Sequence, residues 1–298
     1  MTKLEGPGNE GKAPKAFYKE TSRDRMNDKA EFIHANARKL LAENRFKMSD
    51  FVSLYGKEAV AKDIVRVQSF IRSNDEQLKR LSPTDAERHE RAKKIGTICE
   101  AAIFRGIKDK NLLGRNAYAQ ATSQHDDWVN GIDLAVQFKK PNQGSSYLGL
   151  AVDVTFASDL TTKFERIKKE IGEGNLARIK YFQSIDDNFR GEVKVARVVV
   201  GVDANRMQQI IAKWDGENGD PFDSKEFKGT LLAETEEQLL TFKKYAKSVG
   251  QEQLSEFYAN DLAVIQEAIK DGGLSADVAK GYDDNVYRSI KENLRNFK

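Results

Sequence analysis

The stretch between residues 116 and 157 limits the fold of this chain more than any other feature. It contains three short segments rich in apolar, β-branched and aromatic residues: NAYAQATS, WVNGIDLAVQF and YLGLAVDVTFA. Polar breaks that contain HDD and KKPNQGSS separate them, as turns separate neighbouring strands of a sheet. The sequence therefore predicts three successive strands in the middle of the chain, over residues 116–123, 128–138 and 147–157.

A helix and a further strand follow these three segments. Residues 158–185 have helical spacing, with a break or kink expected at Gly172 and Gly174. The segment EVKVARVVVGVD is the strongest strand signal in the chain, and its valine-rich run indicates a strand buried on both faces. Residues 28–109, and those from about 225 onward, have helical spacing as well. The predicted order in the middle is thus helix, strand, strand, strand, helix, strand.

We divide the chain into four parts on this basis. Residues 1–28, rich in Gly, Lys and Glu, are predicted to form a flexible tail without the apolar segment of a secretory signal. Residues 29–92 form a helical N-terminal region, residues 93–215 an α/β core, and residues 216–298 a helical C-terminal region. The expected fold class is α/β (α+β).

The composition limits the settings and activities that fit the chain. The 49 Lys and Arg residues against 46 Asp and Glu leave a net charge of +3, too small to indicate a nucleic-acid partner alone. Cys99 is the only cysteine, so no internal disulfide forms and a reducing compartment is favoured. No run approaches the roughly 18 apolar residues of a membrane span. We therefore expect a cytoplasmic protein without a membrane partner.

Several recognisable enzyme motifs are missing from the sequence. It contains no P-loop, no GxGxxG, no GxSxG and no CxxC pair. These absences exclude the recognisable forms of P-loop NTPases, dinucleotide-binding enzymes, α/β-hydrolases and zinc ribbons.

The second and third predicted strands each carry one aspartate in an apolar setting. Because side chains alternate between the faces of a strand, Asp133 shares a face with Gln137, and Asp153 shares one with Thr155. If the strands pair with these faces aligned, the two aspartates lie on one surface. The helix that precedes the strands carries Glu100, which could approach the same surface. The sequence therefore predicts a group of carboxylates at one place on the sheet.

A carboxylate on an apolar strand is costly to bury without compensation, and two kinds of compensation are open. In the structural alternative, Asp153 forms an ion pair with Arg115 or Lys163, and Asp133 only ends the turn-like segment NGID. In the functional alternative, the carboxylates hold a hard divalent cation such as Mg²⁺, which prefers oxygen ligands. Such an ion polarises a phosphoryl oxygen and lowers the pKa of a bound water.

His125 and Cys99 are two further residues with reactive side chains, and a structural role is favoured for both. His125 lies beside Asp126 and Asp127 in SQHDDW and could be a metal ligand or a general base, but polar clusters of this kind usually form loops. This loop would lie at one end of the predicted group of carboxylates, so Asp126 or Asp127 could contribute to that group. Cys99 is expected to be a small buried core residue, as free cysteines usually are.

The predicted order of elements resembles the PD-(D/E)XK nuclease superfamily. In that superfamily a helix supplies a glutamate, the second strand an aspartate, and the third strand an acid followed two residues later by a lysine. The matching positions here are Glu100, Asp133, Asp153 and Thr155, over roughly the middle third of the chain. The resemblance implies an αβββαβ restriction-endonuclease-like core with mainly helical N- and C-terminal additions.

The sequence departs from the superfamily pattern at the lysine. Thr155 stands at that position in DVT, and some members of the superfamily take the lysine from the following helix instead. Lys163 is the first candidate for this role because it lies in the first two turns of that helix, and Lys168 is the second. Gln137, on the aspartate face of the neighbouring strand, could add a polar contact.

The resemblance implies a Mg²⁺-dependent deoxyribonuclease, with an endonuclease favoured. Asp133, Asp153 and Glu100 would hold Mg²⁺, or Mn²⁺ in its place, and Lys163 would assist the reaction. The helical regions, with basic residues between aromatic ones, would shape a DNA channel or form a homodimer. Two alternatives stay open: a catalytically inactive nuclease-fold module that binds DNA or protein, and a helical scaffold in which the sheet is only structural.

Overall fold

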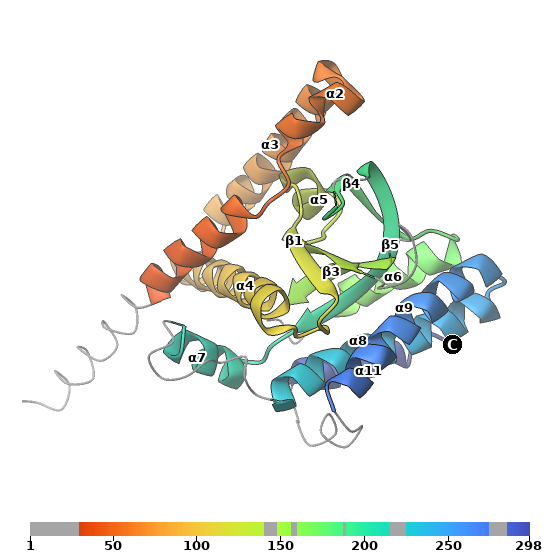
Figure 1. Ribbon diagram of the computed structural model, residues 1–298. Helices are drawn as coiled ribbons and strands as arrows, with labels where there is room; N and C mark the ends of the chain where they lie inside the picture. The colour runs from red at the N-terminus through yellow and green to blue at the C-terminus, as the bar shows by residue number, and fades with distance from the viewer. Residues whose placement is uncertain (1–29, 140–147, 156–159, 187–188, 215–224, 274–284) are drawn as a thin grey trace, which may run out of the picture.

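Five strands form one mixed sheet at the centre of the computed structural model (Figure 1). The structure describes residues 30–139, 148–155, 160–186, 189–214, 225–273 and 285–298, so the predicted tail over residues 1–28 lies outside the described residues. The strand order is β1-β2-β3-β5-β4, and only β3 and β5 pair in parallel. The strands are β1 (Ala117–Ala121), β2 (Leu134–Phe138), β3 (Leu148–Thr155), β4 (Ala177–Gln183) and β5 (Arg190–Gly201).

Helices precede, interrupt and follow this sheet. A helix over residues 30–43 comes first, followed by η1 (Met48–Phe51), α2 (Val52–Tyr55), α3 (Lys57–Lys79) and α4 (Pro83–Lys110). Two helices lie between strands: α5 (Gln124–Trp128) and α6 (Thr161–Gly172). The C-terminal helices are α7 (Ala204–Ala212), α8 (Lys225–Ser248), α9 (Glu252–Asp271) and α11 (Asn285–Leu294).

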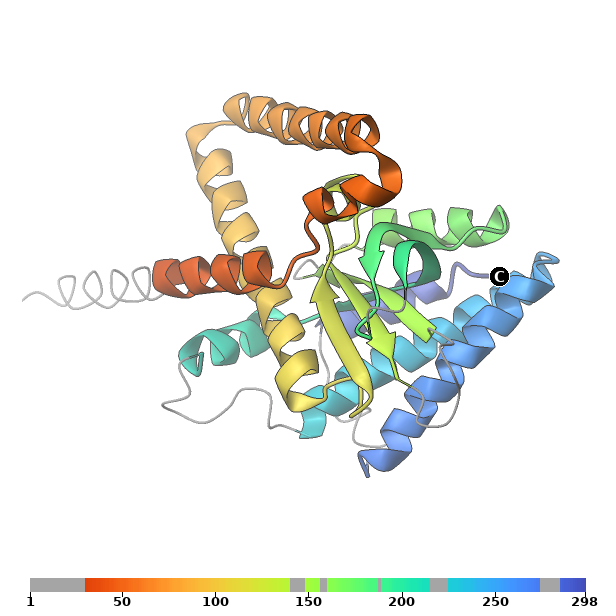
Figure 2. The ribbon, with the colours of Figure 1, turned by 45° about the horizontal axis from the view of Figure 1, so that its top comes forward.

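The two faces of the sheet are covered differently. The large side chains of β2 and β3, among them Leu134, Val136 and Val152, lie in the main core with residues of α4, α8, α9 and α11. On the other face the small residues Ala135 and Ala151 pack with side chains of β4 and β5. Figures 1 and 2 show α8, α9 and α11 side by side, whereas α3 and the first part of α4 extend away from the sheet. The strand alternation therefore leaves small residues on the face that also carries the predicted aspartates.

The α/β (α+β) class is confirmed, but two segments differ from the prediction. Residues 177–183, expected to be helical, form β4 in a hairpin with β5, because α6 ends at Gly172 and Gly174 adopts a positive φ of 74°. The strand expected over residues 128–138 begins only at Leu134, since residues 124–128 form α5. The sheet therefore has one more strand than the predicted order.

The predicted parts of the chain share one hydrophobic core. Helix α4 continues through the boundary placed between residues 92 and 93. The main core joins residues from Ile33 in the first helix to Phe297 near the C-terminus. None of the helices in the described ranges combines the length and apolar character needed to cross a membrane.

Candidate functional site

Asp153 and Lys163 form an ion pair at the end of β3. Asp153 lies opposite Val199 of the parallel strand β5, and its Oδ1 atom accepts a hydrogen bond from Nζ of Lys163, the third residue of α6. The two side chains are 15% and 30% exposed, so the pair is open to solvent on one side. The lysine from the following helix therefore lies beside this carboxylate, whereas Arg115 lies elsewhere, by the hollow described below.

The main chain fixes Asp133 at the same end of the sheet. Its N–H donates to the carbonyl of Val152 (3.1 Å), and its carbonyl accepts from the N–H of Thr122 (3.0 Å). Its carboxylate Oδ2 accepts a hydrogen bond from the N–H of Val154 at 2.7 Å. Asp133 thus stands just before β2 rather than within it, with its carboxylate turned toward the main chain of β3 at Val154.

Glu100 and Asp127 meet at a residue that the sequence did not point to, Arg45. The Nη1 atom of Arg45 donates to Oδ2 of Asp127 at 2.9 Å, and its Nη2 atom lies 4.0 Å from Oε1 of Glu100. Glu100 is on α4 between the buried residues Cys99 and Ala101. Within the described part of the chain, its Oε1 atom is buried and has no hydrogen-bond partner. One carboxylate of this group is therefore incompletely compensated.

A short β-bridge holds Arg45 in place. Arg45 pairs in parallel with Ala121 at the edge of β1, where the N–H of Phe46 donates to the carbonyl of Ala121 and the N–H of Ala121 donates to the carbonyl of Asn44, both at 3.1 Å. The ring of Phe46 packs edge-on against Phe182, with centroids 5.8 Å apart. A single bridge leaves no periodic pattern along the chain, so Arg45 could not be placed at the site from its neighbours in sequence.

Burial and neighbouring negative charges raise the pKa values of several carboxyl groups at this end of the sheet. Burial raises the pKa of Asp133 to about 8, with further contributions from Asp153 and Asp127. Burial also raises the pKa of Glu100 well above its usual range, and the charges of Asp133 and Asp127 add to this effect. The pKa of Asp127 is raised mainly by burial as well, although Arg45 opposes the shift. These effects connect the side chains of Glu100, Asp127, Asp133 and Asp153. We call these four residues together the carboxylate group.

Three other predicted residues lie outside this group of carboxylates. Gln137 accepts a hydrogen bond through Oε1 from the N–H of Ile185 at 3.0 Å, at the other end of β2. Lys168 donates to the carbonyl of Asn296 at 2.5 Å and faces the C-terminal segment. Thr155 is buried in β3 opposite Gly201 and does not supply a charge. Of the two candidate lysines, Lys163 is thus the one beside Asp153.

His125 and Asp126 belong to a structural network rather than to the carboxylate group. The short helix α5 replaces the expected loop, and its N-cap Ser123 accepts a hydrogen bond from the N–H of Asp126. The carboxylate of Asp126 accepts from the N–H groups of Lys180 (2.8 Å) and Tyr181 (3.1 Å), so it ties α5 to β4. This network fixes the helix on which the neighbouring Asp127 is carried.

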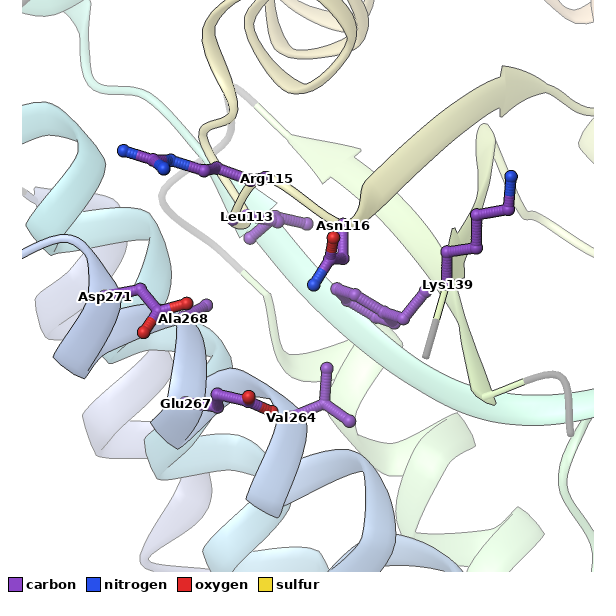
Figure 3. A pocket seen from close by; sticks show the side chains of 10 residues that line it. Leu113, Arg115, Asn116, Lys139, Val264, Glu267, Ala268 and Asp271 are labelled. Carbon is purple, nitrogen blue, oxygen red and sulfur yellow. The ribbon is translucent and has the colours of Figure 1, made fainter. Parts of the chain in front are cut away.

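A hollow on another part of the surface is separate from these residues. It lies between the segment after α4, the end of β2 and helix α9 (Figure 3). Its volume of about 40 Å³ accommodates a few water molecules but not a nucleotide. The lining includes Arg115, Lys139, Glu267 and Asp271, and no residue of the carboxylate group.

The donor chemistry of the carboxylate group fits a hard divalent cation. The described residues hold no ready-made set of three or more His, Cys, Asp or Glu side chains around a metal position. The buried Oε1 atom of Glu100 without a partner, and the raised pKa of Asp133, nevertheless mark carboxylates that an oxygen-preferring cation would stabilise. No protein-family model, curated protein or solved structure matches the chain.

Proposed function

We propose that the chain is a Mg²⁺-dependent nuclease that hydrolyses phosphodiester bonds of DNA. The observation that carries the proposal is a chain of neighbouring charges: Lys163 pairs with Asp153, the charge of Asp153 acts on Asp133, and that of Asp133 acts on Glu100. The elements that supply them follow in the order α4, β2, β3 and α6, and β5 is parallel to β3. This order and these residue types agree with what the resemblance to the PD-(D/E)XK superfamily implies.

Each residue of the group has a distinct part in the proposed reaction. Asp133, Asp153 and Glu100 would hold Mg²⁺ or Mn²⁺, which polarises a phosphoryl oxygen and lowers the pKa of a water when bound. The Lys163 ammonium would donate to a phosphate oxygen as negative charge develops there. Arg45 would orient Asp127 through its bond of 2.9 Å.

Cleavage of supercoiled plasmid and of labelled single-stranded DNA, in Mg²⁺, Mn²⁺ or EDTA, tests the proposal. Asp153→Asn removes a charge from the group and should lower cleavage at least about 100-fold. Asp109→Asn is the matched control, because Asp109 is half exposed and pairs only loosely with Arg105, at 3.9 Å. We expect metal-dependent cleavage by wild type and by Asp109→Asn. Equal cleavage by Asp153→Asn, or none by folded wild type in either metal, would overturn the proposal.

One observation favours a second candidate, a catalytically inactive DNA-binding module. Two protein cations, Lys163 and Arg45, already pair with Asp153 and Asp127, and Thr155 stands where the superfamily has its usual lysine. If protein cations alone neutralise these carboxylates, no metal ion is held there, and the protein would bind DNA without cleaving it. Retained DNA binding by wild type, together with no cleavage in Mg²⁺ or Mn²⁺, would support this candidate.

A further inference from the structure

Arg166 on α6 carries a positive charge that the protein balances only in part. Its Nε atom donates to Oε1 of Glu170 at 3.2 Å. The same carboxylate also accepts from Nε (3.2 Å) and Nη2 (3.1 Å) of the buried Arg197. Two guanidinium groups therefore share one carboxylate, which leaves one positive charge in excess.

The Arg166 side chain is partly exposed, with its Nη1 atom close to Gly131. The side chain is 44% exposed. Among the residues described, no acceptor takes a hydrogen bond from its Nη1 or Nη2 atom. By contrast, both Nη atoms of Arg197 are used, on the carbonyls of Gly131 (2.7 Å) and Asn130 (3.0 Å) and on Glu170. Among the described residues, Arg166 thus has two Nη groups without an acceptor, whereas both Nη groups of Arg197 donate to acceptors of the protein.

Arg166 lies at the rim of the carboxylate group. It follows Lys163 by three residues, so the two side chains leave α6 on the same face. A Cβ atom added to Gly131, two residues before Asp133, would lie 2.8 Å from its Nη1 atom. Burial and the charge of Arg197 lower the pKa of Arg166, whereas Glu170 and Asp153 act in the opposite direction. The guanidinium is therefore close enough to Asp153 to interact with it electrostatically.

We infer that Arg166 binds a phosphate of the DNA backbone adjacent to the phosphate that is cleaved. A planar guanidinium with two Nη groups matches two oxygens of one phosphate, which a point charge cannot do. The ammonium of Lys163 is neutralised by Asp153 and is less suited to that contact. The absence of a side chain at Gly131 lets the Nη1 atom of Arg166 lie close to this residue. The inference rests on the proposed function and adds a substrate-positioning contact to it.

Fluorescence anisotropy with labelled DNA tests the inference apart from cleavage. Binding is measured in EDTA and in Ca²⁺, which shares the preference of Mg²⁺ for oxygen ligands. Arg166→Gln should weaken binding about tenfold, equally for two unrelated sequences, and should lower the slope of log Kd against log salt by about one. The matched control is Arg178→Gln, because Arg178 is 54% exposed and its Nε atom pairs with Glu192 at 3.0 Å, outside the carboxylate group. The control should bind as wild type does.

A second variant keeps the inference testable if the first is unstable. Arg166→Lys retains the charge but loses the fork, so it should show a smaller loss, between wild type and Arg166→Gln. If Arg166→Gln binds DNA as tightly as wild type and Arg178→Gln do, while wild type cleaves DNA, the inference is wrong and the proposed function stands. If wild type neither binds nor cleaves DNA, the proposed nuclease function and the phosphate contact of Arg166 are both wrong.

Discussion

The buried carboxyl group of Asp133 permits a quantitative prediction about stability. We expect Asp133→Asn to gain stability relative to the wild type as pH rises from 5 to 8 in the absence of metal. Burial, followed by the charges of Asp153 and Asp127, raises the pKa of Asp133 to about 8. An asparagine oxygen can still accept the bond of 2.7 Å from the N–H of Val154. The substitution therefore removes the charge and keeps the local hydrogen bond.

The sign of the effect follows from proton binding in the two states. Between about pH 4 and pH 8, Asp133 holds a proton in the folded chain and is ionised in the unfolded chain, so wild-type stability falls as pH rises. Each pH unit is worth about 1.4 kcal/mol, which sets an upper limit of about 6 kcal/mol over the window. Water entry and the rearrangement of neighbouring charges reduce the change, and we expect about 2 kcal/mol.

Urea unfolding in EDTA at pH 5 and pH 8 measures this difference. The free energy of unfolding of Asp133→Asn minus that of wild type should increase by about 2 kcal/mol between the two pH values. Asp109→Asn is the control, because its half-exposed carboxylate should give a difference that does not change with pH. A difference that stays constant, or that decreases toward pH 8, would refute the reasoning about burial.

The same measurement with metal links stability to the proposed function. A cation bound to the folded chain at 100 times its Kd stabilises that chain by about 2.7 kcal/mol. Mg²⁺ should therefore stabilise wild type at pH 8 and leave Asp133→Asn almost unchanged. Equal stabilisation of both proteins would mean that Mg²⁺ binds somewhere other than at Asp133.

Two further substitutions test the packing and the hydrogen bonds of residues next to the site. Gly201→Ala should cost about 3 kcal/mol in urea unfolding, because the added Cβ atom would collide with the backbone oxygen and the methyl group of Thr155; an unchanged midpoint would contradict this packing. Asp63→Ala should cost about 2 kcal/mol at pH 7, because Asp63 accepts hydrogen bonds from Lys180 (2.5 Å) and Tyr181 (2.6 Å). These bonds hold the pKa of Asp63 below its usual value despite burial, so the cost should shrink as pH falls through that pKa, as unfolding at pH 3 would show.

The strands that carry the aspartates were predictable because their side chains alternate. Large and small residues occupy opposite faces of β2 and β3, and the structure packs these faces into two different cores. The strand β4 was missed although ARIKYFQ also alternates, with Ala177, Ile179 and Tyr181 buried. The helical period of α6 runs up to Gly172, and only two residues separate the positive-φ Gly174 from the strand. A tight turn of this kind is easily taken for a kink within one helix.

The candidate site was predictable to the extent that its residues lie on regular elements. Asp153 and Lys163 follow from the strand and the helix that carry them, and the structure brings them into contact. Asp126 and Asp127 were both candidates from the loop-like segment HDDW, and that context did not indicate which of the two side chains faces the site. Arg45 depends on one isolated bridge to Ala121 and on no local pattern at all. Contacts between irregular segments are set by the tertiary fold, so a single sequence does not reveal them.

Arg45, which the sequence did not point to, and Asp127, which it named only as one of two candidates in the HDD loop, change the charge balance of the site. Among the described residues, four carboxylates interact there, Glu100, Asp127, Asp133 and Asp153, and Arg45 is the cation beside Asp127 and Glu100. With Lys163, two protein cations pair directly with these carboxylates, and Arg166 lies at the rim of the group. A structural ion-pair network is expected to be balanced, because each uncompensated buried charge is destabilising. Two of the four carboxylates have no directly paired cation in the described part of the chain, and the raised pKa of Asp133 indicates that a proton takes part of that role. A divalent cation bound as proposed would compete with protons for the same carboxylates, so the pH dependence of stability bears directly on the proposed nuclease.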